Sequence, residues 1–600
     1  MKFAAFFVKN YQFTLIVFLM VLMLGVNSLL NMPRGEDPPF NAPIFVIVAI
    51  YPGTSPQDME ELVADPIEER LYELEDIKKI TSRVYDGVVV TSVDFKFSVD
   101  LETKKNIVNR EVNALRSQLP ADLLSLEIST VQSSDVNILQ HALVSTTAPY
   151  KLLEERAEKI KKALEKNKDL KKVTIAAFPK QEVKISINLE KMARNRLGLN
   201  RVLGALQSSN VNIPGGGLEL GDKTLNIKTT ADFEKIEDIR RAIVQASPAG
   251  VVMLQDIADV TMGYEDETHI ARHNGKRAVW INASLKDRKN ILQTRQQIEK
   301  ILQEEIKEMP ADIAFDPVFD QSRYVSHRLE SFARDFSIAI GLVLLTLLPL
   351  GWRASLVVMI SIPLSLAMGL AMLDGLGYTI NQLSIVGMVV ALGLLVDDSI
   401  IVVENIERFL RMGYDRVTAS IEATNQIFVA VLGCTATLIL AFLPLTFLPE
   451  GPGEFVRSLP MAVLCTVLAS LFVALTIIPF LSSKLLHHHE SEEGNFFMRM
   501  FKKYVNKPYR GVLEWGFRYP VITLLLALAI FLGSLALIPV IGFSVFPKSE
   551  KNMFLVNIET PLGTNLQTTD LAAQYVEQKL GKYTEIKSMA TNVGKGNPRI

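Results

Sequence analysis

The chain has 600 residues, of which 49% are hydrophobic and 21% are charged, and its 63 basic residues nearly balance its 65 acidic ones. This composition is too apolar for an ordinary soluble enzyme and too charged for a bare bundle of membrane helices, so we expect the apolar residues to be clustered. A net charge of −2 provides no basic field for nucleic acid, and the two cysteines, Cys434 and Cys465, both lie in apolar runs, which excludes a disulfide scaffold.

Seven apolar stretches approach the length of a membrane-spanning helix. A hydrocarbon core of about 30 Å is crossed by about 20 mostly apolar helical residues. The first stretch is longer than the apolar core of a signal peptide, and Asn31–Arg34 lacks a small-residue cleavage site, so we expect an uncleaved anchor. The predicted spans are Phe13–Leu30, Phe336–Leu350, Leu356–Leu373, Leu383–Val403, Ile427–Phe447, Leu459–Leu481 and Val521–Ile541.

The basic residues of the short loops predict the orientation of these spans. With a cytoplasmic amino terminus, Arg457 is the single basic residue of the opposite short loops. The positive-inside rule favours this arrangement, which places residues 31–335 outside the cytoplasm. The basic residues on the cytoplasmic side are then Lys2, Lys9, Arg353, Arg408, Arg411, Arg416 and the set in Lys484–Arg518.

The long segment between the first two spans has the pattern of small α+β units. Ile44–Ile50 predicts a strand, and Ser55 is the expected N-cap of a helix over Pro56–Tyr72, which Pro66 should kink. Such units have antiparallel sheets with helices on one face. Further elements are expected at Val88–Phe97, Thr103–Ser117, Leu139–Ser145, Leu152–Lys166, Val173–Ala177, Val183–Leu189 and Ala278–Glu308, with an irregular insertion at Pro214–Gly217.

The end of the chain repeats the pattern of its start. The interval from Pro38 to Pro547 equals that from Phe45 to Phe554, and both prolines follow an apolar span and precede a predicted strand, turn and polar helix. This order favours an internal duplication. Because one strand and one helix cannot bury a sheet face, we expect the natural protein to continue beyond Ile600.

Two adjacent acids interrupt the fourth apolar span. Asp397 and Asp398 would each cost about 2.5–3.5 kcal/mol at a helix centre, and such acids usually face a protein interior or a water path. Neighbouring helical residues point about 100° apart, so the two carboxyl groups cannot face one partner in the same way. Desolvation and repulsion make protonation changes possible, which suits a proton carrier. The alternative is hydrogen bonding between helices, which predicts that Asn can replace either acid.

Two other polar residues in the region of the fourth span have simpler explanations than proton transfer. Glu404 lies near the cytoplasmic end of the span, where a carboxylate can reach water. Asn381 lies about four turns before the acid pair, and we expect it to be a helix cap or a loop residue.

The fourth span closely resembles a motif of the resistance-nodulation-division (RND) efflux pumps, particularly the hydrophobe- and amphiphile-exporting multidrug branch. The matching residues are Gly393–Ile400 and Val402–Asn405, and the resemblance extends over essentially the whole chain. It implies a multi-pass protein of the bacterial inner membrane, with a large periplasmic domain of ferredoxin-like units, that exchanges protons for substrate. It also implies a homotrimer with a periplasmic adaptor and an outer-membrane channel, driven by the proton motive force without a cofactor.

The resemblance assigns roles to individual residues. Asp397 and Asp398 match the proton-relay aspartates, whose basic partner lies in a later span that these 600 residues do not include. Phe178 resembles a substrate-pocket aromatic, although a core Phe at a strand end is an equal alternative. Gly215–Gly217 resembles the start of a docking insertion that is shorter here than in well-known members.

The resemblance also implies a division of the chain. The expected parts are 1–30, the amino terminus and first span; 31–135, the first porter subdomain; 136–199 and 276–330, two parts of the second; 200–275, the docking subdomain; 331–485, the second to sixth spans; 486–517, a cytoplasmic loop with an amphipathic helix; 518–542, the seventh span; and 543–600, the start of a further porter region.

Several alternatives remain open at this point. The heavy-metal branch typically lacks the adjacent Asp pair, and His487–Glu490 lies in a polar loop that is typical of a solvated linker, so we predict no metal site. Phe496–Val505 has the spacing of an amphipathic helix on the cytoplasmic membrane face. No enzyme motif is evident. Two functions compete with drug export. The chain could be a related transporter of lipids, envelope components or metals, or it could be a membrane sensor or scaffold that transports nothing.

Overall fold

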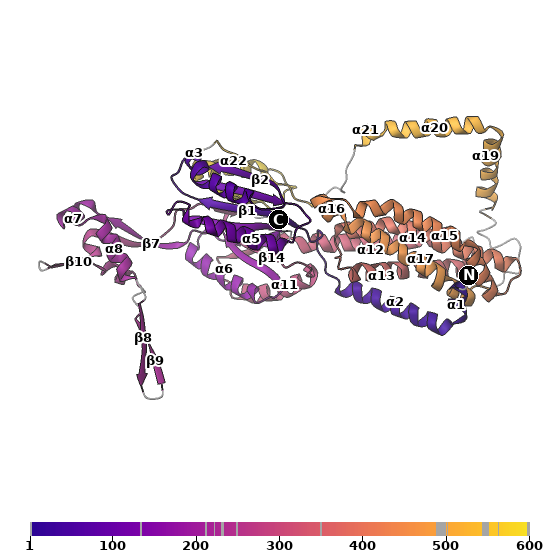
Figure 1. Cartoon of the computed structure of the whole chain (residues 1–600), viewed down its shortest axis with the longest axis horizontal. Helices are drawn as coiled ribbons and strands as arrows, with labels where there is room; N and C mark the ends of the chain where they lie inside the picture. Colours follow the sequence, from indigo (N-terminus) through magenta and orange to yellow (C-terminus); the bar gives the residue numbers. More distant parts are fainter. Residues whose placement is uncertain are drawn as a thin grey trace.

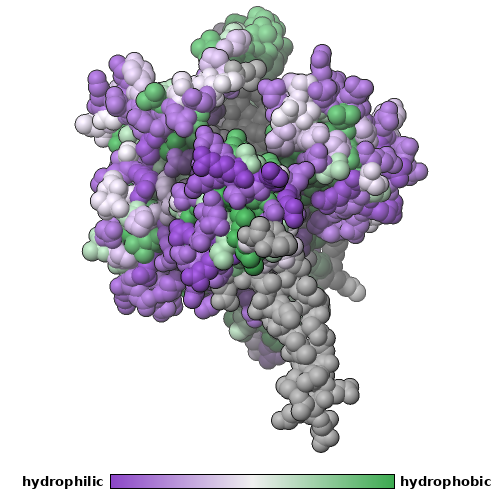
Figure 2. All heavy atoms as spheres, turned by 90° about the vertical axis from the view of Figure 1, so that its left-hand side faces the viewer, coloured by the Kyte–Doolittle hydropathy of each residue, from purple (hydrophilic) through white to green (hydrophobic). Residues whose placement is uncertain are grey.

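The chain forms a helical bundle at one end of an elongated molecule and sheet-containing units toward the other (Figure 1). The computed structural model describes residues 3–132, 135–210, 213–220, 223–229, 233, 235–247, 250–347, 351–487, 500, 502–542, 551–561 and 563–596. Seen from the end away from the bundle, the surface is mostly hydrophilic (Figure 2). The apolar and charged residues are therefore separated along the molecule, as the composition predicts.

Six helices of the described chain are long and apolar enough to cross a membrane. The predicted span that is not among them, Phe336–Leu350, lies in α12 (Gln321–Leu347), where Glu330, Arg334 and Asp335 interrupt the apolar stretch. The remainder of that predicted span, 348–350, lies outside the described residues. The six are α2 (Tyr11–Asn31), α13 (Trp352–Gly375), α14 (Gln382–Arg411), α15 (Arg416–Thr446), α17 (Ser458–Leu485) and the helical stretch Pro520–Ile541, made of α20 (Pro520–Ala536) and α21 (Ile538–Ile541).

The bundle is built around α17. This helix is the most buried of the six candidate spans and packs against α13, α14 and α15. Gly369 of α13 permits one of these approaches, because an added Cβ would lie 2.8 Å from the Cα of Thr466. The shorter helices α1 (Phe3–Lys9) and α16 (Glu450–Val456) also pack beside α15 and α17, whereas no residue of α20 is buried and Figure 1 shows it apart from the bundle.

The first sheet unit has the order β2-β3-β1-β4, with every neighbouring pair antiparallel. Ser55 caps the helical segment that starts at Pro56, accepting a hydrogen bond from the Asp58 backbone N–H, as predicted. A π-helical stretch precedes Pro66, which lacks the N–H for a regular helical bond. The elements are β1 (Asn41–Ile50), α3 (Pro56–Met59), η1 (Glu60–Ala64), α4 (Asp65–Tyr72), β2 (Ile77–Tyr85), β3 (Val88–Phe95), α5 (Leu101–Ala114), η2 (Leu115–Ser117) and β4 (Ser125–Gln132).

The second sheet unit places β5 and β14 between β15 and β6, again with antiparallel neighbours. Its two helices, α6 and α11, share one apolar core with the sheet, in which Leu143, Ile160 and Ile298 are almost fully buried. The elements are β5 (Asn137–Val144), α6 (Tyr150–Glu165), β6 (Leu170–Ala176), β14 (Lys276–Leu285), α11 (Ile291–Lys307) and β15 (Ala314–Asp320), with β13 (Ile270–His273) beside β14.

A third region contains β7. The order of the predicted elements places its strand, Val183–Leu189, in one α+β set with Leu139–Ser145, Leu152–Lys166 and Val173–Ala177. That grouping is wrong, because β7 pairs with β12 in a separate two-stranded sheet. The sequence could identify the strand but not its distant partner. The elements are β7 (Gln181–Ile187), α7 (Leu189–Arg194), α8 (Leu199–Ser209), α9 (Ile236–Arg240), β10 (Ile243–Ser247), β11 (Gly250–Met253), α10 (Leu254–Ile257) and β12 (Ala258–Tyr264).

The glycine-rich insertion was expected to be irregular, and this prediction is wrong. The segment forms a hairpin of β8 (Ile213–Leu220) and β9 (Lys223–Thr229). The register shifts between Pro214 and Gly217, so the two intervening glycines, Gly215 and Gly216, lie in a bulge. Glycine in a strand often marks such a bulge, which reconciles the turn-like composition with the strand.

The last described segments match the predicted repeat only in part. Residues 551–561 contain no strand, so the strand expected around Phe554 is wrong for the described residues, whereas the polar helix is present as α22 (Leu566–Leu580). The short strand β16 (Ala590–Val593) adds to β13 and extends the second sheet. An extended segment becomes a strand only when another strand pairs with it, and local sequence does not reveal that partner.

Candidate functional site

The acid pair lies in α14, whose start is fixed by Asn381. The Oδ1 atom of Asn381 accepts hydrogen bonds from the backbone N–H groups of Leu383 and Ser384, both at 3.0 Å. The expectation that Asn381 is a helix cap is therefore confirmed. The helix then runs without interruption to Arg411, past both acids.

Asp398 is buried between helices, with 4% of its surface exposed. The Thr435 hydroxyl of α15 lies 3.3 Å from its Oδ2 atom and 3.0 Å from the carbonyl oxygen of Val431. Because the hydroxyl has one proton, it can donate to only one of these two acceptors at a time. Among the residues that the structure describes, no cation forms an ion pair with Asp398.

Asp397 points to a different side of α14 and is exposed. It shares this side with Val390 and Ile401, which are 42% and 45% exposed. One acid therefore faces the neighbouring helix while the other lies on an uncovered apolar face, in agreement with the rotation of about 100° per helical residue.

Further polar contacts connect α14 to the helices around it. The hydroxyls of Ser361 and Ser399 form a hydrogen bond of 2.9 Å between α13 and α14, and Ser470 of α17 donates to the carbonyl oxygen of Leu395 at 3.0 Å. Nearer the cytoplasmic end of the predicted orientation, Asn405 donates to the carbonyl oxygen of Ala423 at 2.8 Å. These bonds hold the backbone on either side of Asp398 in one position.

The carboxyl-terminal half of α14 contains a second buried acid that the sequence analysis did not single out. Glu407 is 5% exposed, whereas the predicted candidate Glu404 is exposed. A three-residue step separates two helical positions by only about 60° around the axis, so the boundary between the exposed and the buried surface of α14 passes between the two glutamates. The apolar residues around Glu407, in particular Ile406 and Leu410, were the available signal.

A scan against protein families gives a match over almost the whole chain. The model of the AcrB/AcrD/AcrF family matches residues 3–599. The chain belongs to this family. It is thus an RND multidrug efflux transporter, and the family's proteins are transporters rather than enzymes.

Phe178, the suggested substrate-pocket residue, is partly buried directly after β6. It packs against the apolar core that α6 and α11 share with the second sheet. It does not line the cavity that the structure contains between the first and second sheet units. Its position is that of a residue at the edge of a core, which does not test a role in substrate binding.

The segments after α17 are only partly described. His487 is exposed, while 488–490 of the suggested histidine cluster lie outside the described residues. Within the described ranges, no group of three His, Cys, Asp or Glu side chains could hold a metal ion. Of the predicted amphipathic segment, 496–499 and 501 are not described. A helix with one apolar side, α19, lies later than predicted, at Lys507–Arg518, after the π-helical η5 (Lys502–Asn506).

A second buried charge lies outside the bundle, in the second sheet unit. The Arg272 guanidinium forms ion pairs with Asp570 at 2.5 Å and Glu577 at 3.1 Å, both on α22. The carboxamide oxygen of Asn592 accepts a hydrogen bond of 2.7 Å from the indole N–H of Trp280. These contacts attach α22 and the β16 strand to the second sheet.

A buried imidazole lies on the neighbouring strand β5. His141 stacks on Phe315 with 4.6 Å between ring centroids. Burial, together with the positive charge of Arg295, lowers the pKa of His141 to about 4. His141 is therefore neutral at physiological pH.

Proposed function

We propose that this transporter couples proton movement to the export of hydrophobic or amphiphilic compounds across the cell envelope. The supporting observation is Asp398, a carboxyl group buried in a span-forming helix with a hydroxyl partner and no cation beside it among the described residues. An uncompensated carboxylate in such surroundings is costly, so binding a proton relieves the cost of desolvation.

The contacts of Thr435 suggest how protonation alters the bundle. When Asp398 is charged, Thr435 donates to the carboxylate; when Asp398 is protonated, the acid can donate to the Thr435 oxygen, which then donates to Val431. One proton thus changes the hydrogen bond between α14 and α15. Such a small, two-state change at a helix interface can be passed on to the helices packed around it.

Asp397 is proposed to act with Asp398 from the uncovered side of α14. The apolar residues beside it, Val390 and Ile401, favour packing against further helices, and a cation presented there would complete the relay. A proton that moves down 100 mV releases about 2.3 kcal/mol, enough for about a fiftyfold gradient of a neutral substrate. No cofactor other than the proton motive force is needed.

The proposed assembly follows from the family. We propose that the protein lies in the bacterial inner membrane as a homotrimer, with its sheet units in the periplasm and connected to an adaptor and an outer-membrane channel. Both sheet units have the strand order of a ferredoxin-like unit and the connectivity β-α-β-β-α-β, which in the second unit is interrupted between β6 and β14 by the third region and β13; this supports an origin of the two units by duplication. A second, longer duplication would explain the equal intervals from Pro38 to Pro547 and from Phe45 to Phe554.

The direct test is export of a lipophilic fluorescent dye from cells that express the transporter. Export should stop when an uncoupler collapses the proton gradient while ATP is maintained. Competition by added phospholipid precursors would favour the transport of envelope components instead. A sensor or scaffold would cause no difference in dye retention between expressing and control cells, and this result would overturn the proposal.

A further inference from the structure

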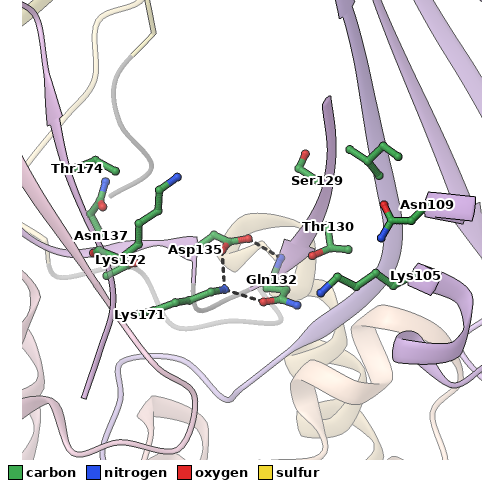
Figure 3. Close-up of a pocket in the computed structure, with 12 residues that line it drawn as sticks. Lys105, Asn109, Ser129, Thr130, Gln132, Asp135, Asn137, Lys171, Lys172 and Thr174 are labelled. Carbon is green, nitrogen blue, oxygen red and sulfur yellow. Dashed lines mark hydrogen bonds and ion pairs between the residues drawn. The ribbon is translucent and has the colours of Figure 1, made fainter. Parts of the chain in front are cut away.

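A cavity of about 550 Å³ lies between the first and second sheet units. Its size falls within the range of about 300–1,000 Å³ that is typical of small-molecule sites. Figure 3 shows Lys105 and Asn109 on one side and Asn137, Lys172 and Thr174 on the other, with Asp135 and Lys171 between them. Two separately folded units therefore supply the opposite walls.

Two edge strands border this cavity. β4 is the last strand of the first sheet, and among the described strands β6 pairs with β14 alone. The outer edge of such a strand has backbone N–H and C=O groups that no neighbouring strand pairs. Residues of both edge strands therefore contribute to the lining of the cavity.

The side chains that line the cavity are almost all polar. Of the 12 residues drawn, Ile128 alone has a hydrocarbon side chain, and the others have ammonium, amide, hydroxyl or carboxyl groups. A lipophilic compound would bury these groups without hydrogen-bond partners, at a cost. The cavity is therefore suited to a hydrophilic molecule, unlike the proposed substrates of the transporter.

The charges of the lining favour an anion. It contains the three ammonium groups of Lys105, Lys171 and Lys172 but only one carboxylate, Asp135, which already lies 2.7 Å from the Lys171 Nζ atom. The nearest carboxylate to Lys105 is Glu102 at 3.9 Å, at the limit of an ion pair. Among the described residues, Lys172 forms no ion pair.

We infer that this cavity binds a hydrophilic organic anion, with a carboxylate or similar oxyanion held by the lysines and hydroxyl groups held by the amides of Asn109 and Asn137. The side chains of Lys105 and Lys171 are 42% and 30% exposed, so both are partly desolvated, and Lys171 also donates a hydrogen bond of 2.6 Å to the Gln132 Oε1 atom. Charge-assisted hydrogen bonds at such positions are stronger than neutral ones. The cavity is a binding site separate from the acid pair in α14.

The test compares three sugars of similar size that differ in charge: glucuronate, glucose and glucosamine. Binding to the purified transporter is measured by saturation-transfer NMR and calorimetry at low and high salt. We expect glucuronate to bind about tenfold more tightly than glucose, a difference of about 1.4 kcal/mol, and this preference to weaken with salt. Glucosamine should bind more weakly than glucose because the lysines repel it.

Three variants assign the effect to the cavity. The double variant Lys105→Gln with Lys172→Gln should lose the preference for glucuronate, while Lys300→Gln, an exposed lysine of α11, should retain it. Asp135→Asn removes the one competing carboxylate and should strengthen glucuronate binding, whereas damage to the fold would weaken it. An unchanged melting temperature of each variant checks that the units remain folded.

Equal binding of glucuronate and glucose would overturn the inference, and so would a preference that survives in the double lysine variant. The inference does not rest on the proposed proton coupling. Asp398→Asn should bind glucuronate as the wild type does, so failure of one proposal leaves the other unaffected.

Discussion

Asp398 in the helical bundle and Arg272 in the second sheet unit are both buried charged residues, but their surroundings differ. Arg272 lies within ion-pair distance of two carboxylates. Asp398 has one hydroxyl at 3.3 Å and no cation partner among the described residues. A counter-charge fixes the ionised form, whereas its absence leaves the proton free to bind and leave. Arg272 therefore serves the architecture, and Asp398 is suited to a changing charge.

The largest effect is expected for Asp398→Asn. Asparagine has nearly the same shape and keeps an oxygen for Thr435, but it cannot exchange a proton. Dye export should fall to the level of cells without the transporter, while expression and melting temperature remain close to the wild type. Glu404→Gln is the matched control, since it removes an exposed acid of the same helix, and it should retain export. Unimpaired export by the Asp398 variant would mean that the acid is only a contact between helices.

For Arg272→Gln we expect a loss of stability rather than a direct loss of proton exchange. This change leaves Asp570 and Glu577 near each other without a cation, and breaking such a buried pair costs about 3–5 kcal/mol. Hydrogen exchange in α22 should become faster. Removing the exposed Arg510–Glu514 pair through Arg510→Gln should cost at most about 1 kcal/mol. Unchanged protection of α22 would show that the ion pairs do not hold it to the sheet.

His141 provides an intermediate case, because it is buried and neutral. Its pKa of about 4 lies below the ordinary value of 6.5, so the unfolded chain binds a proton more readily than the folded one. Burial of the neutral His141 imidazole therefore contributes to the free energy of unfolding in full above about pH 6.5. As the pH falls toward 4, the protein loses about 3 kcal/mol of this stability, because the unfolded chain binds the proton first.

The measurement for His141 is urea unfolding followed by the fluorescence of Trp280, which is fully buried on the adjacent strand, in a protein whose other two tryptophans, Trp352 and Trp515, are replaced by Phe. His141→Phe preserves a ring against Phe315 but cannot titrate, so its stability should change less between pH 7 and pH 4.5 than that of the wild type. Equal pH dependence in both proteins would rule out His141 as the source.

The smallest effect is expected for Thr435→Val. It removes the hydroxyl beside Asp398, and one hydrogen bond contributes about 1 kcal/mol, or about a fivefold change. Export should fall by about this factor, and its pH optimum should move, because the two protonation states of Asp398 lose a shared partner. Thr435→Ser should restore both. A lower rate with an unchanged pH profile would indicate that the methyl and hydroxyl groups matter only for packing.

The sequence predicted the long elements well, because their signals are local. Continuous apolar runs marked the six confirmed candidate spans, and Ser55 and Asn381 were recognisable as caps. The errors concern partners. The sequence identified β7 as a strand but did not reveal its pairing with β12. The segment around Phe554 was expected to be a strand, but it pairs with no strand in the described structure.

The residues of the candidate site also fall into those that local sequence reveals and those that only a distant partner reveals. Asp397 and Asp398 stood out because acids are costly in an apolar helix. Thr435 could not be found from its own segment, since its contact depends on the register between α14 and α15. The same is true of the cavity, whose lysines come from separate units and are unremarkable in sequence as solvent-facing residues.

The central claim is that Asp398 exchanges a proton during transport. Inside-out vesicles that contain the transporter, a pH-sensitive dye and an imposed proton gradient test it directly. Adding substrate should release protons from the acidic lumen with the wild-type protein and with Glu404→Gln, but not with Asp398→Asn. Substrate movement without proton release in the wild type, or equal proton release in the Asp398 variant, would contradict the account.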